Sequence, residues 1–472
     1  MSTRVRVGAA RAVPLPIQAS VMPEDGLAQL LRCPRCVDAA LSLQRDCWVC
    51  AGCGTQFPTI DGLPWLFVEP QATLAEWRGR LHRLLLELEN DAGLVRTELG
   101  RADLRALTRS RLKLLASAYS DHARRLQALL APLDLGRQQE RLETHLALRT
   151  RLPASQDLTS YYVNLHRDWV WGAEENEASF SLVRDLLDGH AAGRTLVLGA
   201  GAGRLAYDFH MRCAPRLTVG LDINPLLLLC ANRIVRGETV SLYEFAIAPR
   251  RLEDHAILRQ LAAERPIGGN FQLVFADAMH APFAPESFDT LITPWFIDIV
   301  AADLAELAPR INRLLRDGGR WLNFGSLSFS HRAAALCYTL EETLEILEQQ
   351  GFERGIEREA TLPYMRSPAS RHGRLESVVA FSALKRTVAE PPAERRVLPE
   401  WLIDLSRPVP LSREFEMTAV ATRIQAFLMS LIDGQRSAQD IAQLLAAQKL
   451  MTPEDAGPAV RAFLIRMYED SC

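Results

Sequence analysis

The sequence predicts an α/β fold in which an open, mostly parallel sheet lies between a cysteine-rich N-terminal module and a small helical C-terminal domain. Three observations support this prediction. A glycine-rich turn follows the apolar run Thr195–Leu198. Further apolar runs downstream alternate with helix-like stretches, which is typical of parallel strands joined by helices. Two C-x2-C pairs lie near the N-terminus, Cys33 with Cys36 and Cys50 with Cys53.

The overall composition is that of a globular chain with more than one domain. The 472 residues are 48% hydrophobic and carry a formal net charge of -3, which argues against a basic nucleic-acid coat and against a highly charged disordered chain. No apolar run approaches the ~20 residues of a membrane helix, and no apolar segment of a secretory signal follows the N-terminal arginines. We therefore expect a cytoplasmic protein with no membrane partner, whose cysteines are metal ligands or buried thiols.

The two cysteine pairs predict a metal site. Thirteen residues separate Cys36 from Cys50, and two such pairs can place four thiolates at the corners of a tetrahedron around a structural Zn2+. Four thiolates leave no open coordination position, so a catalytic zinc fits this set less well. Unmetallated cysteines buried in a small hairpin are the alternative.

The segment around these cysteines resembles the small zinc-ribbon proteins that bind and activate methyltransferases. Their pattern of C-P-x-C, C-x2-C-G, aromatic-Pro and D-G-I-P is matched at Cys33–Cys36, Cys50–Gly54, Phe57–Pro58 and Asp61–Pro64. The resemblance covers roughly residues 25–70. In that family the ribbon stabilises a methyltransferase partner, which implies that here the partner is fused in the same chain.

Residues 71–155 predict a helical region. Leu81, Leu84, Leu85 and Leu88 fall at helical spacing, and so do the leucines between 104 and 115. The segment is mildly basic, which is compatible with an RNA-binding face. Solvated faces of amphipathic helices explain so small an excess more simply.

The glycine-rich turn predicts a cofactor site. Gly199, Gly201 and Gly203 follow the strand directly, at the point where a ligand must approach the backbone closely. The spacing G-x-G-x-G is the S-adenosylmethionine version of this turn, and the dinucleotide version has its third glycine one residue later. A degenerate nucleotide loop in an ordinary α/β domain is the alternative.

Two further predicted strands end in residues suited to a nucleoside. Leu217–Leu221 leads to Asp222, whose carboxylate can accept both ribose hydroxyls. Phe271–Phe275 leads to Asp277 and Ala278, where a carboxylate and a backbone N–H could bind the adenine edge.

The pattern continues to the end of the domain. Phe288–Ile292 is a further strand, and a helix over Leu304–Leu315 stops at Asp317–Gly319 before the strand Arg320–Phe324. Together these elements predict a Rossmann-like class I methyltransferase sheet over residues 156–388.

This domain resembles the carnosine N-methyltransferase family over roughly residues 100–385. The family methylates an imidazole nitrogen of a histidine-containing dipeptide with S-adenosylmethionine. The matching motifs are Arg167–Trp169, Gly199–Ala206, Trp295–Asp298 and Gly319–Gly325. The last two are more specific than the glycine loop.

The resemblance implies roles on the cofactor side. Arg167 and Trp169 would help cover the cofactor. The three glycines of the loop would line its methionine end, with Arg204 beside them.

The resemblance also implies roles on the substrate side. Asp298 matches the aspartate that holds the substrate imidazole. His331 resembles the family histidine after the fifth strand but sits one residue later, and Tyr364 matches a tyrosine in the segment before the last strand. From position alone Asp298 could equally cap a helix, and His331 could be an ordinary surface or core histidine. Three tyrosines of the family are replaced here by Gly373–Leu375, which implies an aromatic wall that is missing or replaced by Arg374.

A linker over 389–400 precedes a small domain over 401–472. Helices are expected over Ala419–Leu431, Ala438–Leu445 and Pro458–Met467, the second capped by Ser437. Through the matching stretch Leu431–Ala442, the segment resembles the winged-helix peptide-recognition fold of pyrroloquinoline-quinone biosynthesis chaperones, which implies peptide binding. A helical packing module without a ligand is the alternative.

Together these observations predict an S-adenosylmethionine-dependent methyltransferase that acts on an imidazole or other nitrogen of a small histidine-containing peptide or peptide-like metabolite. Methylation of tRNA or of a translation protein is a second hypothesis, drawn from the relatives of the ribbon; nucleic acid is not expected as a partner but stays open. A non-catalytic scaffold that only binds the cofactor is a third.

Overall fold

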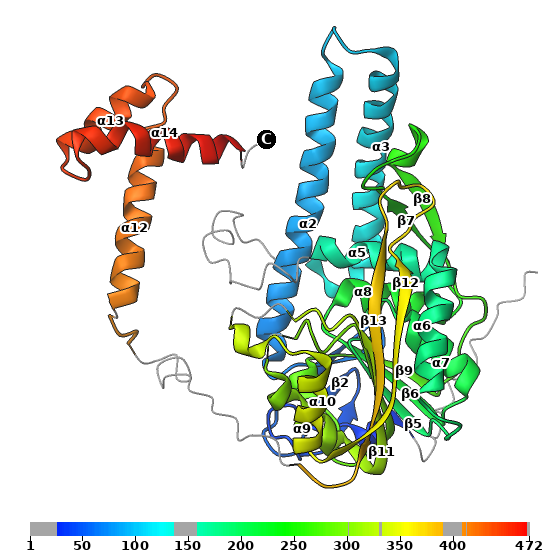
Figure 1. Cartoon of the computed structure of the whole chain (residues 1–472). Helices are drawn as coiled ribbons and strands as arrows, with labels where there is room; N and C mark the ends of the chain where they lie inside the picture. Colours follow the sequence, from blue (N-terminus) through cyan, green and yellow to red (C-terminus); the bar gives the residue numbers. More distant parts are fainter. Residues whose placement is uncertain are drawn as a thin grey trace, which may run out of the picture. The chain divides into compact units, whose positions relative to one another are not determined.

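The computed structural model divides the chain into two compact units, Met1–Pro392 and Ala393–Cys472 (Figure 1), which are described separately. The structure describes residues 26–135, 158–300, 302–329, 333–389, 408–411 and 413–469.

A twisted sheet forms the centre of the first unit. Five strands in the order β9-β6-β5-β10-β11 are parallel, and β13 joins them antiparallel and pairs with the edge strand β12. Their bounds, in sheet order, are Phe271–Ala276 (β9), Leu217–Asp222 (β6), Arg194–Leu198 (β5), Phe288–Pro294 (β10), Leu315–Gly325 (β11), Arg374–Lys385 (β13) and Phe352–Tyr364 (β12). This order reverses direction at β5, which confirms the predicted fold class and places ligand sites at the carboxyl ends of β5 and its neighbours.

Both faces of the sheet are covered, which explains why its parallel strands are continuously apolar. On β5, Val197 packs into one core while Leu196 and Leu198 pack into the other. The first core holds α6 (Ala173–Asp185), α7 (Arg204–Cys213) and α8 (Pro225–Val235). The second holds α9 (Leu304–Leu314) and α10 (Leu340–Gln349).

The helix α9 ends within one residue of its predicted end, but the predicted start of the next strand needs a correction. The helix ends at Leu314, and Asp317–Gly319 lies inside β11. Leu315 is already extended, while its N–H still donates to Ile311. The two glycines therefore shape the start of a strand.

The cysteine-rich module extends the same sheet. Its strands are β1 (Leu41–Gln44), β2 (Cys47–Cys50), β3 (Gln56–Ile60) and β4 (Leu63–Leu66), preceded by the short helix α1 (Leu27–Leu30). The first three pairings are antiparallel, and β4 pairs in parallel with β9, with Trp65 opposite Phe275. One eleven-stranded sheet results.

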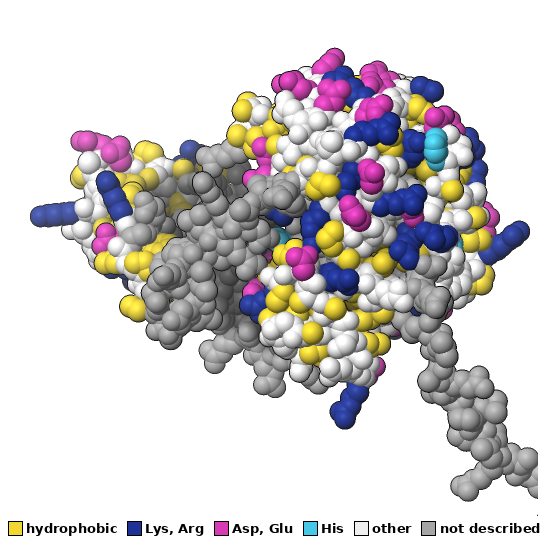
Figure 2. Space-filling view, turned by 90° about the horizontal axis from the view of Figure 1, so that it is seen from below, with side chains coloured by type: hydrophobic (Ala, Val, Ile, Leu, Met, Phe, Trp, Pro, Cys, Tyr) yellow, Lys and Arg dark blue, Asp and Glu magenta, His cyan; other side chains and the backbone are white. Residues whose placement is uncertain are grey.

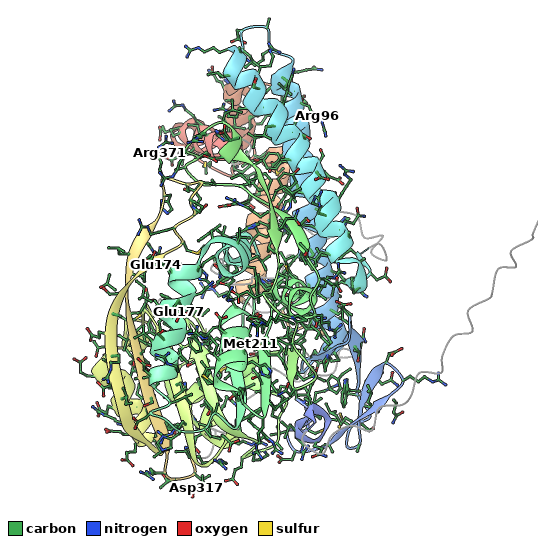
Figure 3. The ribbon with its side chains drawn as sticks, turned by 90° about the vertical axis from the view of Figure 1, so that its right-hand side faces the viewer. Arg96, Glu174, Glu177, Met211, Asp317 and Arg371 are labelled. Carbon is green, nitrogen blue, oxygen red and sulfur yellow. The ribbon has the colours of Figure 1, made fainter. Side chains whose placement is uncertain are left out.

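A long helical hairpin follows the module. It consists of α2 (Pro70–Leu99) and α3 (Ala106–Leu129), which lie side by side in Figure 1. Of the leucines expected at helical spacing, Leu81 and Leu85 are buried, but Leu107 is 75% exposed. The labelled Arg96 marks the far end of this hairpin, and Asp317 lies at the opposite end of the view (Figure 3).

Shorter elements complete the first unit. The helix α5 (Leu158–His166) continues into the π-helical turn η4 (Arg167–Trp171). A separate hairpin of β7 (Val240–Glu244) and β8 (Ile257–Leu261) packs near α3. On the face of this unit shown in Figure 2, basic and acidic side chains are interspersed.

The second unit is a small helical domain within its described residues, which contain no strand. Its helices are α12 (Arg413–Ser430), α13 (Ala438–Ala447) and α14 (Pro453–Glu469). Ser437 caps α13 with Asp440 in a reciprocal capping box. The third helix starts five residues earlier than expected, because Pro453 suits a first helical position and Thr452 accepts the Asp455 N–H.

Among the described helices, none has both the length and the apolar composition needed to cross a bilayer.

Candidate functional site

A cavity of about 1070 Å³ opens at the carboxyl ends of β5, β6, β9 and β10. Its walls come from the glycine loop, the loops after the other three strands, η4, the end of β12 and the first turns of α2. Pockets for a single small ligand have volumes of about 300–1000 Å³. The cavity is therefore large enough for a cofactor and a second small molecule together.

The glycine loop presents bare backbone to this cavity. Gly199 (φ 69°) and Gly201 (φ 56°) both line it, in a conformation that other residues rarely adopt. A Cβ on Gly199 would lie 2.4 Å from a ring carbon of Phe296, whereas the space beside Gly201 is open. The loop thus allows a ligand to approach closely.

Gly203, Trp169 and Arg204 hold this loop in place. Gly203 (φ 82°) caps α7 and, like Trp169, lies outside the cavity lining. The buried indole of Trp169 donates to the Ala202 carbonyl at 2.8 Å. Arg204 lines the cavity, pairs with Asp208 at 2.8 Å and donates to the Asp168 carbonyl at 3.1 Å.

Arg167 also lines the cavity but is fully engaged with carboxylates. Its guanidinium pairs with Asp168 at 2.7 Å and with Glu175 at 3.2 Å. Burial opposes its charge, but these two carboxylates raise its pKa above the usual range. Burial raises the pKa of Glu175. This carboxylate also accepts the Met365 N–H at 3.0 Å, so it connects η4 and α6 to the end of β12.

Asp222 closes the cofactor side of the cavity. Its two carboxylate oxygens accept the N–H groups of Gly201 at 2.7 Å and Asn224 at 2.8 Å. Each oxygen keeps a lone pair for a ribose hydroxyl. Burial raises the pKa of this carboxyl.

Asp277 and Ala278 line the next wall. One oxygen of Asp277 accepts the Met279 N–H at 2.9 Å, and the other lies 3.3 Å from the His280 ring. The loop, Asp222 and this pair lie at three successive strand ends around one cavity. Their chemistry fits the methionine, ribose and adenine portions of S-adenosylmethionine.

Asp298 lies on the other side of the cavity, where it is 5% exposed. Its Oδ2 accepts the Ser328 N–H at 2.7 Å and the Ser326 hydroxyl at 3.2 Å, while Oδ1 makes no hydrogen bond to the described residues. Asp303, not Asp298, caps α9 by accepting the Ala305 N–H at 3.0 Å. The helix-capping alternative for Asp298 is therefore wrong.

Aromatic side chains line the same wall. Trp295 (φ 49°) packs on Tyr364 with ring centres 4.9 Å apart. Such backbone strain in a bulky residue is typical of functional sites. Arg374 stacks on Tyr364 at 4.6 Å, and burial raises the pKa of that tyrosine. Trp295 and Tyr364 give this wall an aromatic face, and Arg374, from the segment that replaces the lost tyrosines, contacts it.

Among the other expected substrate residues, His331 lies outside the described residues. The sequence interpretation also missed two groups that line the cavity. Ser326 and Ser328 follow β11, and a further set lies on two helices: Thr73, Glu76, Trp77 and Arg80 on α2 and Glu306 and Arg310 on α9. The α2 residues have the spacing of one helix face, but that spacing does not indicate what the face contacts.

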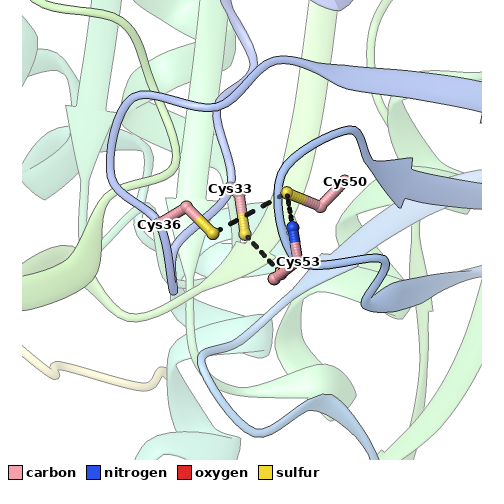
Figure 4. Close-up of side chains that lie close together, drawn as sticks. All are labelled: Cys33, Cys36, Cys50 and Cys53. Atoms are coloured by element: carbon pink, nitrogen blue, oxygen red, sulfur yellow. Dashed lines mark hydrogen bonds between the residues drawn. The ribbon is translucent and has the colours of Figure 1, made fainter.

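The four predicted cysteines meet in the N-terminal module (Figure 4). Their sulfurs all lie within 4.8 Å of one another, with Cys33 to Cys53 at 3.8 Å and Cys36 to Cys50 at 3.9 Å. Zinc–thiolate bonds of about 2.3 Å imply tetrahedral sulfur separations of about 3.8 Å. Backbone N–H groups of Gly52 and Cys53 point at the Cys50 sulfur at 3.3 and 3.4 Å. The set therefore fits a structural zinc ion.

Cys47 lies outside this cluster and donates to the Phe57 carbonyl. Burial raises the pKa of Cys33 to about 12. A bound cation would offset this cost and hold the sulfur as a thiolate.

The strand order, the glycine loop and the carboxylates at the strand ends define the class I S-adenosylmethionine-dependent methyltransferases. Residues 149–382 match the family model of carnosine N-methyltransferase. The resemblance expected from the sequence is confirmed for the methyltransferase domain.

Curated relatives agree with this assignment. Carnosine N-methyltransferase of Mus musculus is 25% identical over 223 residues, which cover 42% of this chain and 54% of that protein. The Rattus norvegicus protein is 26% identical over 222 residues, with the same coverage. The chain thus spans about half the length of the curated relatives it matches.

Solved methyltransferase structures also align with the chain. A putative S-adenosylmethionine-dependent methyltransferase from Listeria monocytogenes has a TM-score of 0.32 and 10% identity, covering 45% of this chain and 99% of its own. Phosphoethanolamine N-methyltransferase 2 from Haemonchus contortus has a TM-score of 0.32 and 14% identity, covering 49% and 59%.

Proposed function

We propose that this chain transfers a methyl group from S-adenosylmethionine to an imidazole or other nitrogen of a small histidine-containing peptide or peptide-like metabolite. The observation that carries the proposal is Asp298, a buried carboxylate in the cavity that is held through one oxygen, while its other oxygen accepts no hydrogen bond from the described residues. The family match over residues 149–382 supports the same substrate class.

When bound, the cofactor supplies a methyl group and keeps the electrons of the broken carbon–sulfur bond on its sulfur. Asp298 Oδ1 accepts the N–H of the substrate imidazole, so that the lone pair of the other ring nitrogen faces the methyl carbon. Positive charge develops on the ring as the new carbon–nitrogen bond forms, and the fixed carboxylate stabilises it. The proton on the first nitrogen then passes to Asp298 and on to water, which leaves a neutral methylated ring.

The other residues of this wall position the substrate. Ser326 and Ser328 hold the carboxylate at a fixed orientation, so no side chain must reorganise as charge appears. Trp295 and Tyr364 offer flat faces for an aromatic ring. Both rings are half-buried and align the acceptor nitrogen at ~3 Å from the methyl carbon, as methyl transfer requires.

We also propose that the four-cysteine cluster holds one structural zinc ion and that the module over residues 25–70 acts as a zinc ribbon. The sulfur separations and the N–H groups directed at Cys50 support this proposal. Peptide binding by the C-terminal helical domain, over residues 401–472, stays a proposal that rests on its resemblance to peptide-recognition chaperones.

A competition assay tests the main proposal. Wild type is incubated with labelled cofactor and a mixture of histidine dipeptides, longer histidine peptides and unmodified tRNA. The acceptors are then separated, and the label transferred to each is measured. Asp298→Asn, which keeps the shape but removes the charge, should lower the rate by ~10²–10³-fold with cofactor affinity unchanged. Asp303→Asn is the matched control, because Asn also caps helices well and Asp303 lies outside the cavity lining.

The possible outcomes separate the three functional hypotheses. Labelling of histidine peptides that Asp298→Asn abolishes supports the proposal. Preferential labelling of tRNA would establish the translation-linked alternative. Normal cofactor binding without transfer to any acceptor would establish the scaffold. Full activity in Asp298→Asn would remove the carboxylate from the mechanism.

A further inference from the structure

Within the described residues, five arginines line the cavity, and four of them already have a carboxylate partner. The pairs are Arg80 with Glu76 (2.7 Å), Arg167 with Asp168 (2.7 Å), Arg204 with Asp208 (2.8 Å) and Arg374 with Glu376 (2.6 Å). Each of these positive charges is therefore compensated before any ligand enters.

Arg310 is the exception. Within the part of the chain that the structure describes, no carboxylate lies within ion-pair distance of it, and its buried Nε has no hydrogen-bond partner. Glu306, one turn earlier on α9, is exposed and makes no ion pair with it in the described structure. A half-buried guanidinium without a partner is energetically unfavourable, and an incoming anion would relieve that cost.

The position of Arg310 assigns it to the substrate side. The helix α9 directly follows the loop that carries Asp298. Leu307, Ile311 and Leu314 bury its apolar face in the core beneath the sheet, and Arg310 lies on the flank of the helix that borders the cavity.

We propose that Arg310 binds a carboxylate of the substrate while Asp298 holds the imidazole. This inference rests on the proposed function and narrows its substrate class to peptides with a free carboxylate, at the C-terminus or on an acidic side chain. A guanidinium matches a carboxylate with two parallel hydrogen bonds, which fixes orientation as well as affinity.

The alternative anchors are already occupied. Arg374, the candidate that the sequence suggested, stacks on Tyr364, pairs with Glu376 and has a side chain that is 60% exposed. Arg80 lies over Trp77 at 4.9 Å and is paired with Glu76. Both would have to give up an existing partner to bind an anion.

Paired ligands test the assignment. Histidine peptides with a free C-terminal carboxylate are compared with the same peptides amidated, by calorimetry on the full chain saturated with S-adenosylhomocysteine and by steady-state kinetics. Wild type should bind the free acids about 10- to 100-fold more tightly, as expected for a charge-assisted bidentate contact. Arg310→Gln should remove that difference by raising KM while kcat changes little, and Arg310→Lys should restore it in part.

Matched measurements keep this test separate from the proposed function. Arg96→Gln, an exposed arginine at the far end of α2 (Figure 3), should behave as wild type. Cofactor affinity should be unchanged in Arg310→Gln, and its loss would overturn the inference by assigning Arg310 to the cofactor. Equal binding of acid and amide by wild type would also overturn it. Absence of methyl transfer to any peptide would instead count against the proposed function, because the binding comparison needs no turnover.

Discussion

The cysteine cluster and the cavity are two sites built in opposite ways. All four sulfurs come from a segment that begins at Cys33 and ends at Cys53, folded as a small hairpin. The cavity collects side chains from α2, from five strand ends between Gly199 and Ser328, and from the end of β12. A local site can be found from the spacing of its residues, whereas a site assembled from distant segments depends on the whole fold.

The two sites are nevertheless joined through one sheet. The strand β4 pairs with β9 beside the loop that carries Asp277, and α2 continues from β4 to the cavity wall. Asp38 of the module pairs with Arg313 of α9 at 2.7 Å. The side-chain amide of Asn232 donates to the Asp61 carbonyl at 3.0 Å. Loss of structure at the cluster should therefore also perturb the cavity.

The largest effect is expected from loss of the metal. Structural zinc supplies folding free energy outright, so chelation or Cys33→Ser should unfold the module and lower the melting temperature of the full chain. Activity per folded molecule should fall less than stability. Elemental analysis should find one zinc per chain, and Cys47→Ser, outside the cluster, is the matched control. A protein purified without chelator that contains no zinc would contradict the assignment.

Removal of the Trp65 side chain, at the joint where the module meets the rest of the sheet, should have the next largest effect. Trp65 is fully buried between the module and the sheet, packs on Phe275 and donates to the Pro70 carbonyl at 2.9 Å. Trp65→Ala should lower the free energy of unfolding by about 3–5 kcal/mol, measured by denaturant titration. Leu43→Ala, at a half-exposed position of β1, should change it far less. If both variants were equally stable, the joint would not couple the two regions.

Asp222 should affect the cofactor without affecting the cluster. Asp222→Ala should weaken S-adenosylmethionine binding by ~1–3 kcal/mol through lost charged hydrogen bonds, with the zinc content unchanged. Calorimetry measures the affinity, and an unchanged value would remove Asp222 from the site.

The same carboxylate predicts how cofactor affinity depends on pH. Burial raises the pKa of Asp222, and ribose hydroxyls donate to its ionised form. Cofactor affinity should therefore have its full value above this raised pKa and should fall as the pH decreases through it. The fall should occur at a higher pH than an exposed aspartate would give. Asp222→Asn should remove this dependence.

The effect that is smallest at neutral pH concerns a buried histidine remote from both sites. Burial lowers the pKa of His122 to about 3, so the folded state stays neutral where the unfolded state, with a pKa near 6.5, takes up a proton. The free energy of unfolding has its full value above pH 6.5 and decreases by up to about 1.4 kcal/mol per pH unit as the pH falls toward 3. His122→Phe should flatten this decline in unfolding titrations at pH 7, 6 and 5. The exposed His372→Phe variant controls for histidine content, and an unchanged slope in His122→Phe would contradict the prediction.

Sequence reasoning succeeded where a signal is short-range. The strands ending at Leu198, Asp222 and Ala276 lie within a residue or two of their predicted positions, because apolar runs between helices admit few other arrangements. It misplaced the start of β11, because Gly318 and Gly319 resembled a helix stop but lie inside that strand, which begins at Leu315. It also left the role of Asp298 open, because capping depends on where a helix actually starts.

The sequence by itself determined the cysteine set, the glycine loop and the succession of strands along the chain, since each depends on residues close together in the chain or on a repeating pattern. Only the tertiary structure decided which side chains share the cavity. It brought α2 to a wall that no motif indicates, packed Trp295 against Tyr364, and gave every lining arginine except Arg310 a carboxylate partner within the described residues. The reason is physical: whether a charge is compensated depends on groups within about 4 Å of it, and those groups come from segments far apart in the sequence.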